Sequence, residues 1–446
     1  MKRQKLCIVG AGSTYTLGMI LSLIEEKEIF PLDSITFYDT DELRQETIAK
    51  ATEILIHERY PELSSFTWTT NKEVAYKDVD FVFIQIRTGG LKMRVSDEKI
   101  PLKHHVVGQE TCGPGGMAYG LRSIPDMIDI VNDIRKYSKD AWILNYTNPA
   151  AIVAEALKRQ FPDDDRILNI CDMPIAIMMS LAKTVNRSVW DIEAEYFGLN
   201  HFGWFTKITD IQGNDLTEAV KKVILYDGIL PEDTLISTDD SWRQTFSQVR
   251  TMLEDYPDYI PNTYLQYYLY PNSIVKKLDV NYVRSEYVID HREQEVFSLA
   301  NQIIQQGNLT GLHVEADVHG QYMVKAAASL AYNLNKRYIV ITKNNGIIPN
   351  ISSEAMVEVT AELTSFGVKP YALKAIPTFY KGLMENQYAY EALVVDAYFE
   401  KNPRKLLQAL VLNRTVIDTE LAKKILLEMA EANEDYWGKW VLEGLQ

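Results

Sequence analysis

Four short segments of the sequence bring together side chains that could do chemistry. Residues 108–116 (GQETCGPGG) place four glycines around an acid, a thiol and a proline, and residues 145–149 (NYTNP) hold two amides. Residues 169–174 (NICDMP) place a thiol beside an acid, and residues 198–204 (GLNHFGW) place a histidine beside an amide and aromatic rings. Thiol, carboxyl and imidazole groups bind metal ions or move protons, so these segments are candidates for an active site.

Each of these residues also has an ordinary structural explanation. A free cysteine such as Cys171 is usually a small buried hydrophobic residue, and His201 could be a core histidine with satisfied hydrogen bonds. Asp172 could be the N-cap of a helix. The amides of Asn145 and Asn148 could cap a turn. Residue types and spacing therefore leave the chemistry open.

A glycine turn near the N-terminus indicates a dinucleotide site. The turn (GAGSTY, 10–15) follows an apolar strand and precedes a helical pattern. Its first two glycines allow a tight turn and close approach of the backbone to a pyrophosphate, although Tyr15 stands where a third glycine is usual. An acid at the end of the second strand would bind the ribose hydroxyls and favour NAD over NADP. The predicted NAD contacts are Gly10, Gly12, Ser13, Thr14 and Asp39.

The first 200 residues alternate strands and helices. Near-continuous apolar runs are typical of a parallel sheet that is covered on both faces, and they occur at 6–9, 34–39, 81–86, 141–146 and 166–171. We therefore predict an α/β fold with a doubly wound, Rossmann-like NAD-binding domain over residues 1–200. In such a sheet, ligands bind outside the carboxyl ends of the strands, where the four segments could converge.

Beyond residue 200 helical patterns dominate. They cover 240–254, 286–306, 323–333, 386–399 and 415–437. We predict a mixed, mainly helical second domain over residues 201–446 that carries catalytic, substrate and subunit contacts. The site should lie between the two domains.

The composition limits the possible partners and location. The 446 residues carry a formal charge of −15, so neither nucleic acid nor an anionic membrane is an expected partner. Three widely spaced cysteines without a C-x-x-C motif favour a reducing compartment. Glycines interrupt the N-terminal apolar stretch, and no run of about 18 apolar residues is present. We expect a cytoplasmic protein.

At these segments the chain resembles glycoside hydrolase family 4, the NAD- and metal-dependent glycosidases. The similarity runs nearly end to end and includes PNTYLQYYLYP (261–271) and NNGIIPN (344–350). It implies an N-terminal domain like that of lactate and malate dehydrogenases. It also implies NAD and Mn²⁺, or another divalent metal, as cofactors, and a homodimer or homotetramer.

Within this family, the tetrapeptide that starts at the metal-binding cysteine varies with the substrate. Cys171-Asp172-Met173-Pro174 resembles the version in 6-phospho-α-glucosidases, whereas the phospho-β-glucosidases typically carry Asn in the second place. The implied substrate is a phosphorylated disaccharide or another α-glucoside 6-phosphate, such as maltose 6'-phosphate. The implied reaction oxidises C3, removes the proton from C2, eliminates the aglycone and adds water, giving glucose 6-phosphate.

The resemblance also assigns roles to individual residues. Cys171 and His201 would bind the metal. Asp172 would act as general acid and Tyr264 as base. Three further residues would contact the substrate: Arg94, Asn148 and Arg284. One of the two arginines would bind the 6-phosphate. A tyrosine can act as base only if its pKa is depressed, which an adjacent metal ion could do.

Three other functions stay open at this point. A 6-phospho-β-glucosidase of the same family is one, although Asp172 argues against it. A lactate/malate-type dehydrogenase is another, which would accumulate NADH with its substrate. A non-catalytic NAD sensor is the third, and it leaves the metal-binding residues without a role.

Overall fold

The first half of the chain alternates strands and helices, as predicted. The computed structural model describes residues 1–231, 240–312, 314, 316 and 318–445. Up to residue 184 the elements are β1 (Gln4–Val9), α1 (Thr16–Glu25), β2 (Leu32–Tyr38), α2 (Glu42–Arg59), β3 (Ser65–Thr69), α3 (Lys72–Tyr76), β4 (Phe81–Ile84), α4 (Gly90–Lys103), α5 (Gly113–Tyr137), β5 (Trp142–Asn145), α6 (Ala150–Gln160), β6 (Ile167–Asn169) and α7 (Met173–Thr184). The apolar runs form strands because helices cover them on both faces; β4 and β5 are buried along their whole length.

The parallel strands have the order β3-β2-β1-β4-β5-β6. This is the doubly wound order of dinucleotide-binding domains, and the reversal between β1 and β4 is where such domains bind their ligand. The Rossmann-like α/β fold is therefore confirmed. All six strands present their carboxyl ends at one edge of the sheet.

The second half adds both helices and strands. They are β7 (Ile192–Leu199), β8 (Phe202–Asp210), α8 (Thr217–Asp227), α9 (Asp240–Asp255), β9 (Ile260–Pro261), α10 (Leu265–Leu269), α11 (Pro271–Val275), α12 (Arg284–Val288), the π-helical turn η2 (Ile289–Glu293), α13 (Gln294–Gln306), α14 (Val318–Tyr332), β10 (Lys336–Lys343), β11 (Met356–Thr364), β12 (Gly367–Pro370), α15 (Thr378–Glu400), α16 (Pro403–Leu412), α17 (Thr419–Ala432), α18 (Glu434–Trp437) and α19 (Lys439–Leu445). The mixed, mainly helical composition agrees with the prediction, but β7, β8, β10 and β11 were not predicted as strands.

One sheet runs through both halves. β10 pairs antiparallel with β6, and the sheet continues as β10-β11-β7-β8-β9. The domain boundary at residue 200 stays a prediction; that residue lies in the turn between β7 and β8. The hairpin therefore carries Asn200 and His201 from the second half of the sheet toward the end of β6.

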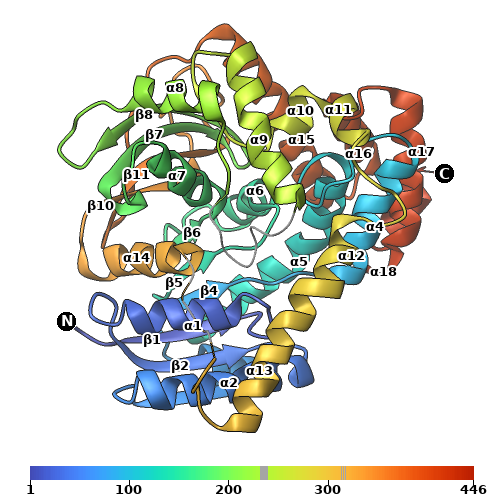
Figure 1. The fold of residues 1–446 in the computed structure, drawn as a ribbon. Coiled ribbons are helices and arrows are strands. Elements are labelled where there is room, and N and C mark those ends of the chain that lie inside the picture. The colour runs from blue at the N-terminus through green and yellow to red at the C-terminus, as the bar shows by residue number, and fades with distance from the viewer. Residues whose placement is uncertain (232–239, 313, 315, 317, 446) are drawn as a thin grey trace.

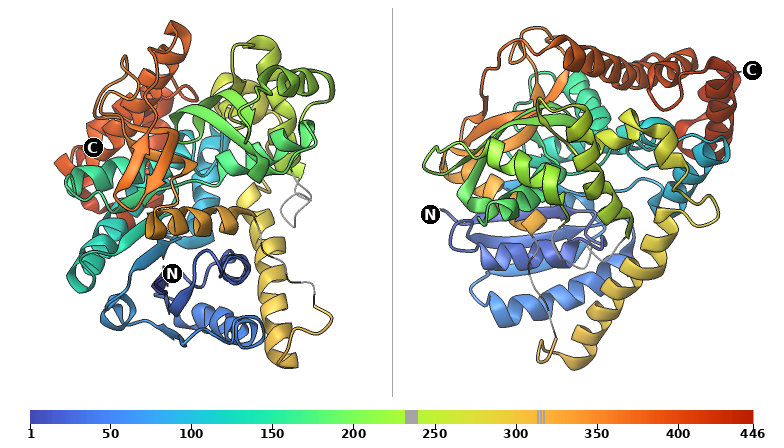
Figure 2. Two further views of the ribbon diagram at one scale, coloured as in Figure 1. Left: turned by 90° about the vertical axis from the view of Figure 1, so that its left-hand side faces the viewer. Right: turned by 45° about the horizontal axis from the view of Figure 1, so that its top comes forward.

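A group of C-terminal helices and one long helix complete the molecule (Figure 1, Figure 2). The C-terminal helices pack together as one group and share a hydrophobic core with α5 and α6. The continuous helix formed by α12, η2 and α13 crosses the molecule and lies against α4 at one end and α2 at the other. It therefore connects the region of Arg284 with the NAD-binding half.

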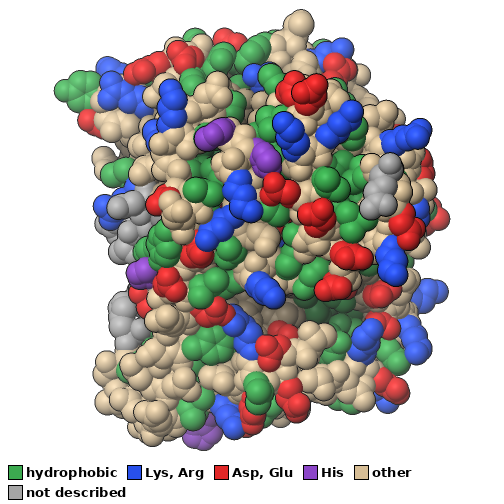
Figure 3. All heavy atoms as spheres, turned by 90° about the vertical axis from the view of Figure 1, so that its right-hand side faces the viewer, with side chains coloured by type: hydrophobic (Ala, Val, Ile, Leu, Met, Phe, Trp, Pro, Cys, Tyr) green, Lys and Arg blue, Asp and Glu red, His purple; other side chains and the backbone are tan. Residues whose placement is uncertain are grey.

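The surface mixes charges of both signs. Figure 3 shows acidic and basic side chains interspersed over one face, without a continuous field of either sign. Among the described residues, no helix is long and apolar enough to cross a membrane.

Candidate active site

The predicted metal ligands meet at the carboxyl edge of the sheet. Cys171 follows β6, and His201 lies in the turn between β7 and β8 with a left-handed φ of 61°. The Cys171 Sγ lies 3.3 Å from the His201 Nε2, and both residues are buried. A single ion could contact both atoms. The turn positions His201, although it lies 30 residues from Cys171 in the chain.

Burial sets the charge of both ligands. It lowers the pKa of His201 to about 4, in spite of the carboxylates of Asp172 and Glu110, so the imidazole is neutral at physiological pH. It raises the pKa of the Cys171 thiol well above its usual value. A neutral imidazole is ready to bind a metal, whereas the thiol must lose its proton when the metal binds.

This donor set fits a divalent ion that the substrate helps to hold. In the described part of the chain, no group of three or more His, Cys, Asp or Glu side chains could hold a metal. Two protein donors leave coordination positions for sugar oxygens and water, which suit a hard ion such as Mn²⁺. Cys171 and His201 are the side chains that would bind it.

Asp172 directly precedes α7, but its side chain does not cap the helix. It occupies the N-cap position without a side-chain capping hydrogen bond. Its Oδ2 lies 2.9 Å from the Nδ1 of His319, near the start of α14. Burial acts to raise the pKa of Asp172, but His319 and Tyr146 outweigh it and lower the pKa to about 2. The ligand-free chain thus holds Asp172 as an anion paired with His319.

Tyr264 lies directly against His201, one of the two predicted metal ligands. Its ring centroid is 4.4 Å from that of His201, and its backbone N–H donates to the Asn262 Oδ1. Burial raises the pKa of Tyr264 well above the usual value, although Arg284 opposes this shift. Without a metal the phenol is protonated, so only an additional nearby cation could make it a base.

Three arginines surround one glutamate beside this centre. Arg87 forms an ion pair with Glu110, and the Arg94 Nη1 lies 3.3 Å from the Glu110 Oε1. Burial acts to raise the pKa of Glu110, but Arg87, Arg94 and Arg284 together lower it to about 2. Glu98 accepts from the Arg94 Nε at 2.8 Å. Three arginines against two glutamates leave one positive charge in excess, which suits a phosphate.

The same glutamate connects Arg94 to the start of α12. The second carboxylate oxygen of Glu98 accepts from the Ser285 backbone N–H at 2.8 Å and from its hydroxyl at 2.9 Å. Ser285 follows Arg284, the first residue of α12. Two arginines from distant parts of the sequence are therefore held on one side of the site.

The two amides of the NYTNP segment have different surroundings. Asn145 donates to Asn169 and accepts from the Thr147 backbone, so it does stabilise a turn. The Asn148 Oδ1 is buried and has no hydrogen-bond partner among the described residues. Such an acceptor is expected to meet a ligand, which agrees with the predicted role of Asn148 in substrate binding.

The glycine turn has the geometry of a dinucleotide loop. Gly10 has a φ of 79°, and a Cβ there would lie 2.8 Å from the Gln85 carbonyl oxygen. Asp39 accepts from the Gly12 N–H at 2.7 Å. Ser13 and Thr14 follow Gly12 in the turn before α1. The predicted NAD contacts thus lie together at the reversal of strand order.

Residues of the second half hold this loop. The Arg292 guanidinium stacks 3.8 Å from the ring centroid of Tyr15 and donates to its hydroxyl at 2.9 Å. Glu293 forms an ion pair with Arg44, whose Nε donates to the Gly12 carbonyl at 2.7 Å. The missing third glycine therefore has a structural reason, since Tyr15 contacts the π-helical turn η2.

A second buried network supports the His201 turn. The Asn200 side chain donates to Glu358 on β11 at 3.0 Å, and Glu358 is fully buried. Burial raises the pKa of Glu358 to about 7, although Asn200 and Tyr196 act to lower it. Tyr196 in turn accepts from Asn262, which also accepts from the Tyr264 backbone. The turns that carry His201 and Tyr264 are thus connected.

Sequence reasoning missed several of these groups. Asn200 and Glu110 stand inside motifs that it singled out, so their positions were visible. Arg87, His319 and Glu358 lie outside those motifs, and nothing local distinguishes them. Only the fold brings them to the site.

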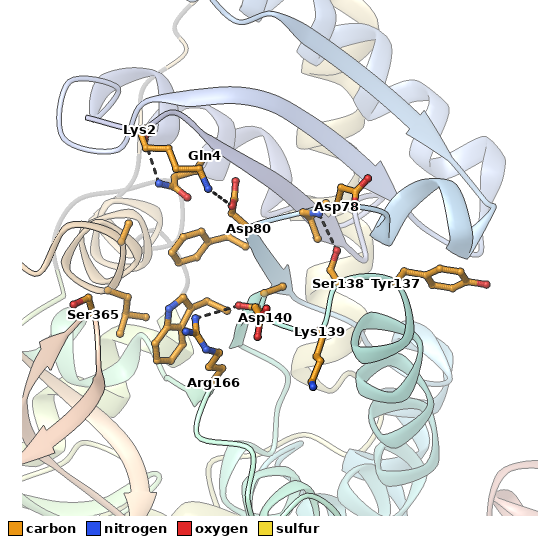
Figure 4. Close-up of a pocket in the computed structure, with 16 residues that line it drawn as sticks. Lys2, Gln4, Asp78, Asp80, Tyr137, Ser138, Lys139, Asp140, Arg166 and Ser365 are labelled. Carbon is orange, nitrogen blue, oxygen red and sulfur yellow. Dashed lines mark hydrogen bonds and ion pairs between the residues drawn. The ribbon is translucent and has the colours of Figure 1, made fainter.

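A cavity of about 570 Å³ lies at the opposite edge of the sheet. It is lined by the amino ends of β1, β4 and β5 and by Lys2, Asp80 and Arg166 (Figure 4). None of the predicted site residues lines it. Volume therefore does not identify the candidate site; the convergence of buried ionisable groups does.

Comparison with known proteins identifies the family of the chain. The sequence matches the family 4 glycosyl hydrolases over residues 5–187 and their C-terminal domain over residues 196–416. It is 49% identical over 443 residues to the phospho-α-glucosidase PagL of Clostridium acetobutylicum, covering 98% of this chain and 100% of that protein. It is 44% identical over 440 residues to a maltose-6'-phosphate glucosidase of Bacillus subtilis, covering 98% of both.

Solved structures extend the comparison. A 6-phospho-α-glucosidase from gut microorganisms, in complex with NAD and Mn²⁺, superposes with a TM-score of 0.94 at 48% identity, covering 98% of this chain and 99% of that one. The 6-phospho-β-glucosidase BglT of Thermotoga maritima is more distant, at 30% identity over 439 residues and 97% of this chain.

The predicted likeness to lactate dehydrogenases also holds for the fold. A lactate dehydrogenase from a deep-sea metagenome covers 89% of this chain with a TM-score of 0.50 and 12% identity. At that identity the likeness shows the fold alone. Both halves of the chain match one enzyme family at full length, and we conclude that the chain belongs to the family 4 glycosyl hydrolases.

Proposed function

We propose that this chain is an NAD- and divalent-metal-dependent glycosidase that hydrolyses 6-phospho-α-glucosides such as maltose 6'-phosphate. The observation that carries the proposal is the meeting of Cys171, His201 and Tyr264 beside a positively charged arginine cluster. These groups supply a metal site, a base and a phosphate site within one part of the molecule. The relatives that are 49% and 44% identical are named phospho-α-glucosidase and maltose-6'-phosphate glucosidase, whereas the 6-phospho-β-glucosidase BglT is 30% identical.

The cofactors supply chemistry that the side chains lack. When bound, NAD provides reversible hydride transfer at the sugar C3, and a divalent ion stabilises negative charge on sugar oxygens. Cys171 and His201 hold the ion. The loop at Gly10 and Gly12, with Asp39, holds the dinucleotide. Hydride is returned at the end of each turnover, so the net reaction is hydrolysis.

The chain's own groups move the protons. Tyr264 removes the proton from C2 after C3 has been oxidised, and its phenol must first be acidified by the nearby ion. Asp172 delivers a proton to the leaving oxygen. Because Asp172 is an anion in the ligand-free chain, the proton has to reach it, and His319 at 2.9 Å is positioned to hold that proton.

Phosphate recognition completes the proposal. Arg94 and Arg284 bind the 6-phosphate, and the buried oxygen of Asn148 accepts from a sugar hydroxyl. Because three arginines face two glutamates, replacing either Arg94 or Arg284 would remove the net positive charge of the cluster. A dimer or tetramer and a cytoplasmic location stay predictions for this chain.

The direct test is hydrolysis of maltose 6'-phosphate with and without NAD⁺ and Mn²⁺. We expect activity only when both are present, and deuterium at C2 of the glucose 6-phosphate formed in D₂O. Stoichiometric NADH would instead indicate a net dehydrogenase. Faster cleavage of p-nitrophenyl β-glucoside 6-phosphate than of the α-anomer would overturn the linkage specificity.

The acid role of Asp172 has its own test. Asp172→Asn should slow the cleavage of maltose 6'-phosphate by about 10²–10⁴-fold, because glucose leaves as a strongly basic alkoxide. The p-nitrophenyl α-glucoside 6-phosphate should be far less affected, since its leaving group is a stable anion. Equal and severe losses on both substrates would refute the acid role.

A further inference from the structure

A short chain of hydrogen bonds leads away from His201 on the side opposite Cys171. The His201 Nδ1 lies 3.1 Å from the Thr111 Oγ1, and that hydroxyl lies 2.9 Å from the Gln109 Oε1. The Thr111 backbone N–H also donates to the Gln109 Oε1, at 2.6 Å. Gln109 and Thr111 belong to the glycine-rich segment before α5, and the proposed mechanism gives neither residue a role.

The direction of each hydrogen bond follows from the types of the groups. The Gln109 Oε1 receives a backbone N–H, so it is the carbonyl oxygen and can only accept. The single Thr111 hydroxyl proton must therefore point to Gln109. The hydroxyl oxygen is then left to accept from His201, so the imidazole proton lies on Nδ1. Nε2 keeps its lone pair and faces the Cys171 Sγ, 3.3 Å away.

We propose that Gln109 and Thr111 are positioning residues that fix the tautomer of His201 and so prepare its Nε2 to bind the metal. The inference rests on the metal-binding role proposed for His201. A metal-bound histidine generally donates its other ring N–H to a partner that sets its orientation. Here the partner is a hydroxyl, and a hydroxyl can also donate. The amide of Gln109 removes that ambiguity.

The glycines of the same segment explain how Thr111 reaches His201. A Cβ on Gly116 would lie 2.5 Å from the Thr111 carbonyl oxygen, and a Cβ on Gly115 would lie 2.3 Å from that of Gln109. The segment therefore packs directly on the first turn of α5. This contact fixes the backbone of both positioning residues, and only glycine at 115 and 116 permits it.

The first test measures the tautomer itself, in the metal-free protein. Long-range ¹H–¹⁵N correlation spectra of histidine-labelled protein distinguish protonated from unprotonated ring nitrogens, and His201→Gln identifies the resonances. We expect a protonated Nδ1 and an unprotonated Nε2. A protonated Nε2 in the wild type would overturn the proposal.

The second test compares two substitutions at Thr111. Thr111→Val removes the hydroxyl at similar size, and Thr111→Ser keeps it. Loss of such a partner typically weakens metal affinity about 10- to 100-fold. We expect that loss for Thr111→Val in Mn²⁺ titrations followed by electron paramagnetic resonance, and an affinity close to that of the wild type for Thr111→Ser. Equal affinities in all three proteins would overturn the proposal.

Substitution of Gln109 tests the tautomer of His201 more sharply than substitution of Thr111 does. Gln109→Leu frees the Thr111 hydroxyl to donate to Nδ1, which selects the tautomer with its proton on Nε2. We expect this variant to bind Mn²⁺ more weakly than Thr111→Val does, and its His201 resonances to show the reversed tautomer. Gln109→Glu keeps an acceptor and should keep the wild-type tautomer. An unchanged tautomer in Gln109→Leu would contradict the proposed role of Gln109.

Two controls separate this inference from the function on which it rests. Thermal unfolding of each variant shows that a loss of affinity is not a loss of folding. Cys171→Ser tests the metal site itself, because a neutral hydroxyl replaces a thiolate. If Cys171→Ser keeps its Mn²⁺ affinity, the metal site is wrong. If Cys171→Ser loses its Mn²⁺ affinity but Thr111→Val keeps it, the metal site is correct and the positioning role of Thr111 is wrong.

Discussion

Two buried arginine clusters share helix α4, and they differ in charge balance. In the first, Arg122 makes two hydrogen bonds to Asp97, at 3.0 and 2.6 Å, and also donates to Asn433 and to the Thr88 carbonyl. Asp97 and Arg122 are each 1% exposed. The guanidinium is thus surrounded by acceptors. This cluster connects α4 and α5 to the C-terminal helices.

The second cluster lies beside the predicted metal ligands and consists of Arg87, Arg94, Arg284, Glu98 and Glu110. It has three cations against two anions. The difference indicates that a balanced buried cluster serves the scaffold, whereas an excess of one charge marks a place for a ligand of opposite charge. The two clusters share α4, so local sequence does not distinguish them.

The largest expected effect is on stability and comes from the balanced cluster. Arg122→Met leaves Asp97 buried without its cation, and breaking such a pair typically lowers the free energy of unfolding by about 3–5 kcal/mol. Chemical denaturation measures this loss. The variant that remains folded should bind Mn²⁺ normally. A loss below about 1 kcal/mol would show that the cluster is not structural.

The next effect is on binding and comes from the unbalanced cluster. Arg94→Met removes a charged hydrogen-bond donor worth about 1.5–3 kcal/mol, so affinity for glucose 6-phosphate should fall about 10- to 150-fold. Calorimetric titration with glucose 6-phosphate, and with glucose as the control, measures this. Equal losses for the two sugars would exclude a phosphate role for Arg94. The same pair of titrations on Arg284→Met would show which arginine contributes more.

The buried carboxyl of Glu391 should make the stability of the fold depend on pH. Glu391 accepts from the Gln387 amide at 2.8 Å, and burial raises its pKa to about 8. The folded state then holds a proton that the unfolded state has lost, so stability falls as pH rises from about 4.5 to 8. The expected slope is about 1.4 kcal/mol per pH unit.

Unfolding of wild type and Glu391→Gln across this pH range tests that expectation. The amide cannot ionise, so the wild-type protein should lose more stability than the variant does between pH 5 and pH 8. Parallel pH profiles would show that Glu391 titrates normally in the folded chain.

The smallest effect is expected at the opposite edge of the sheet. Lys2 pairs with Asp80 beside the cavity of Figure 4, but the lysine side chain is 71% exposed. Lys2→Ala should change the free energy of unfolding by less than about 1 kcal/mol and leave glucose 6-phosphate binding unchanged. A large loss of binding would mean that this cavity, and not the arginine cluster, holds the phosphate.

Local patterns predicted most of the first half of the fold, although β3 was missed. The five apolar strands and the glycine turn are short-range features, and the structure has them where they were expected. The strands β10 and β11 were missed because their pairing depends on the distant strands β6 and β7. Sheet pairing between residues far apart in sequence leaves no local signature.

The sequence by itself determined the family and predicted the cofactors and the site residues, because their motifs are contiguous. The tertiary structure alone decided that His319 pairs with Asp172, that Arg87 pairs with Glu110, that Glu358 accepts from Asn200, and that Thr111 contacts His201. Each of these contacts joins residues far apart in the chain across the carboxyl edge of one sheet. Charge, burial and hydrogen-bond direction depend on such neighbours, and the neighbours exist only once the sheet has formed.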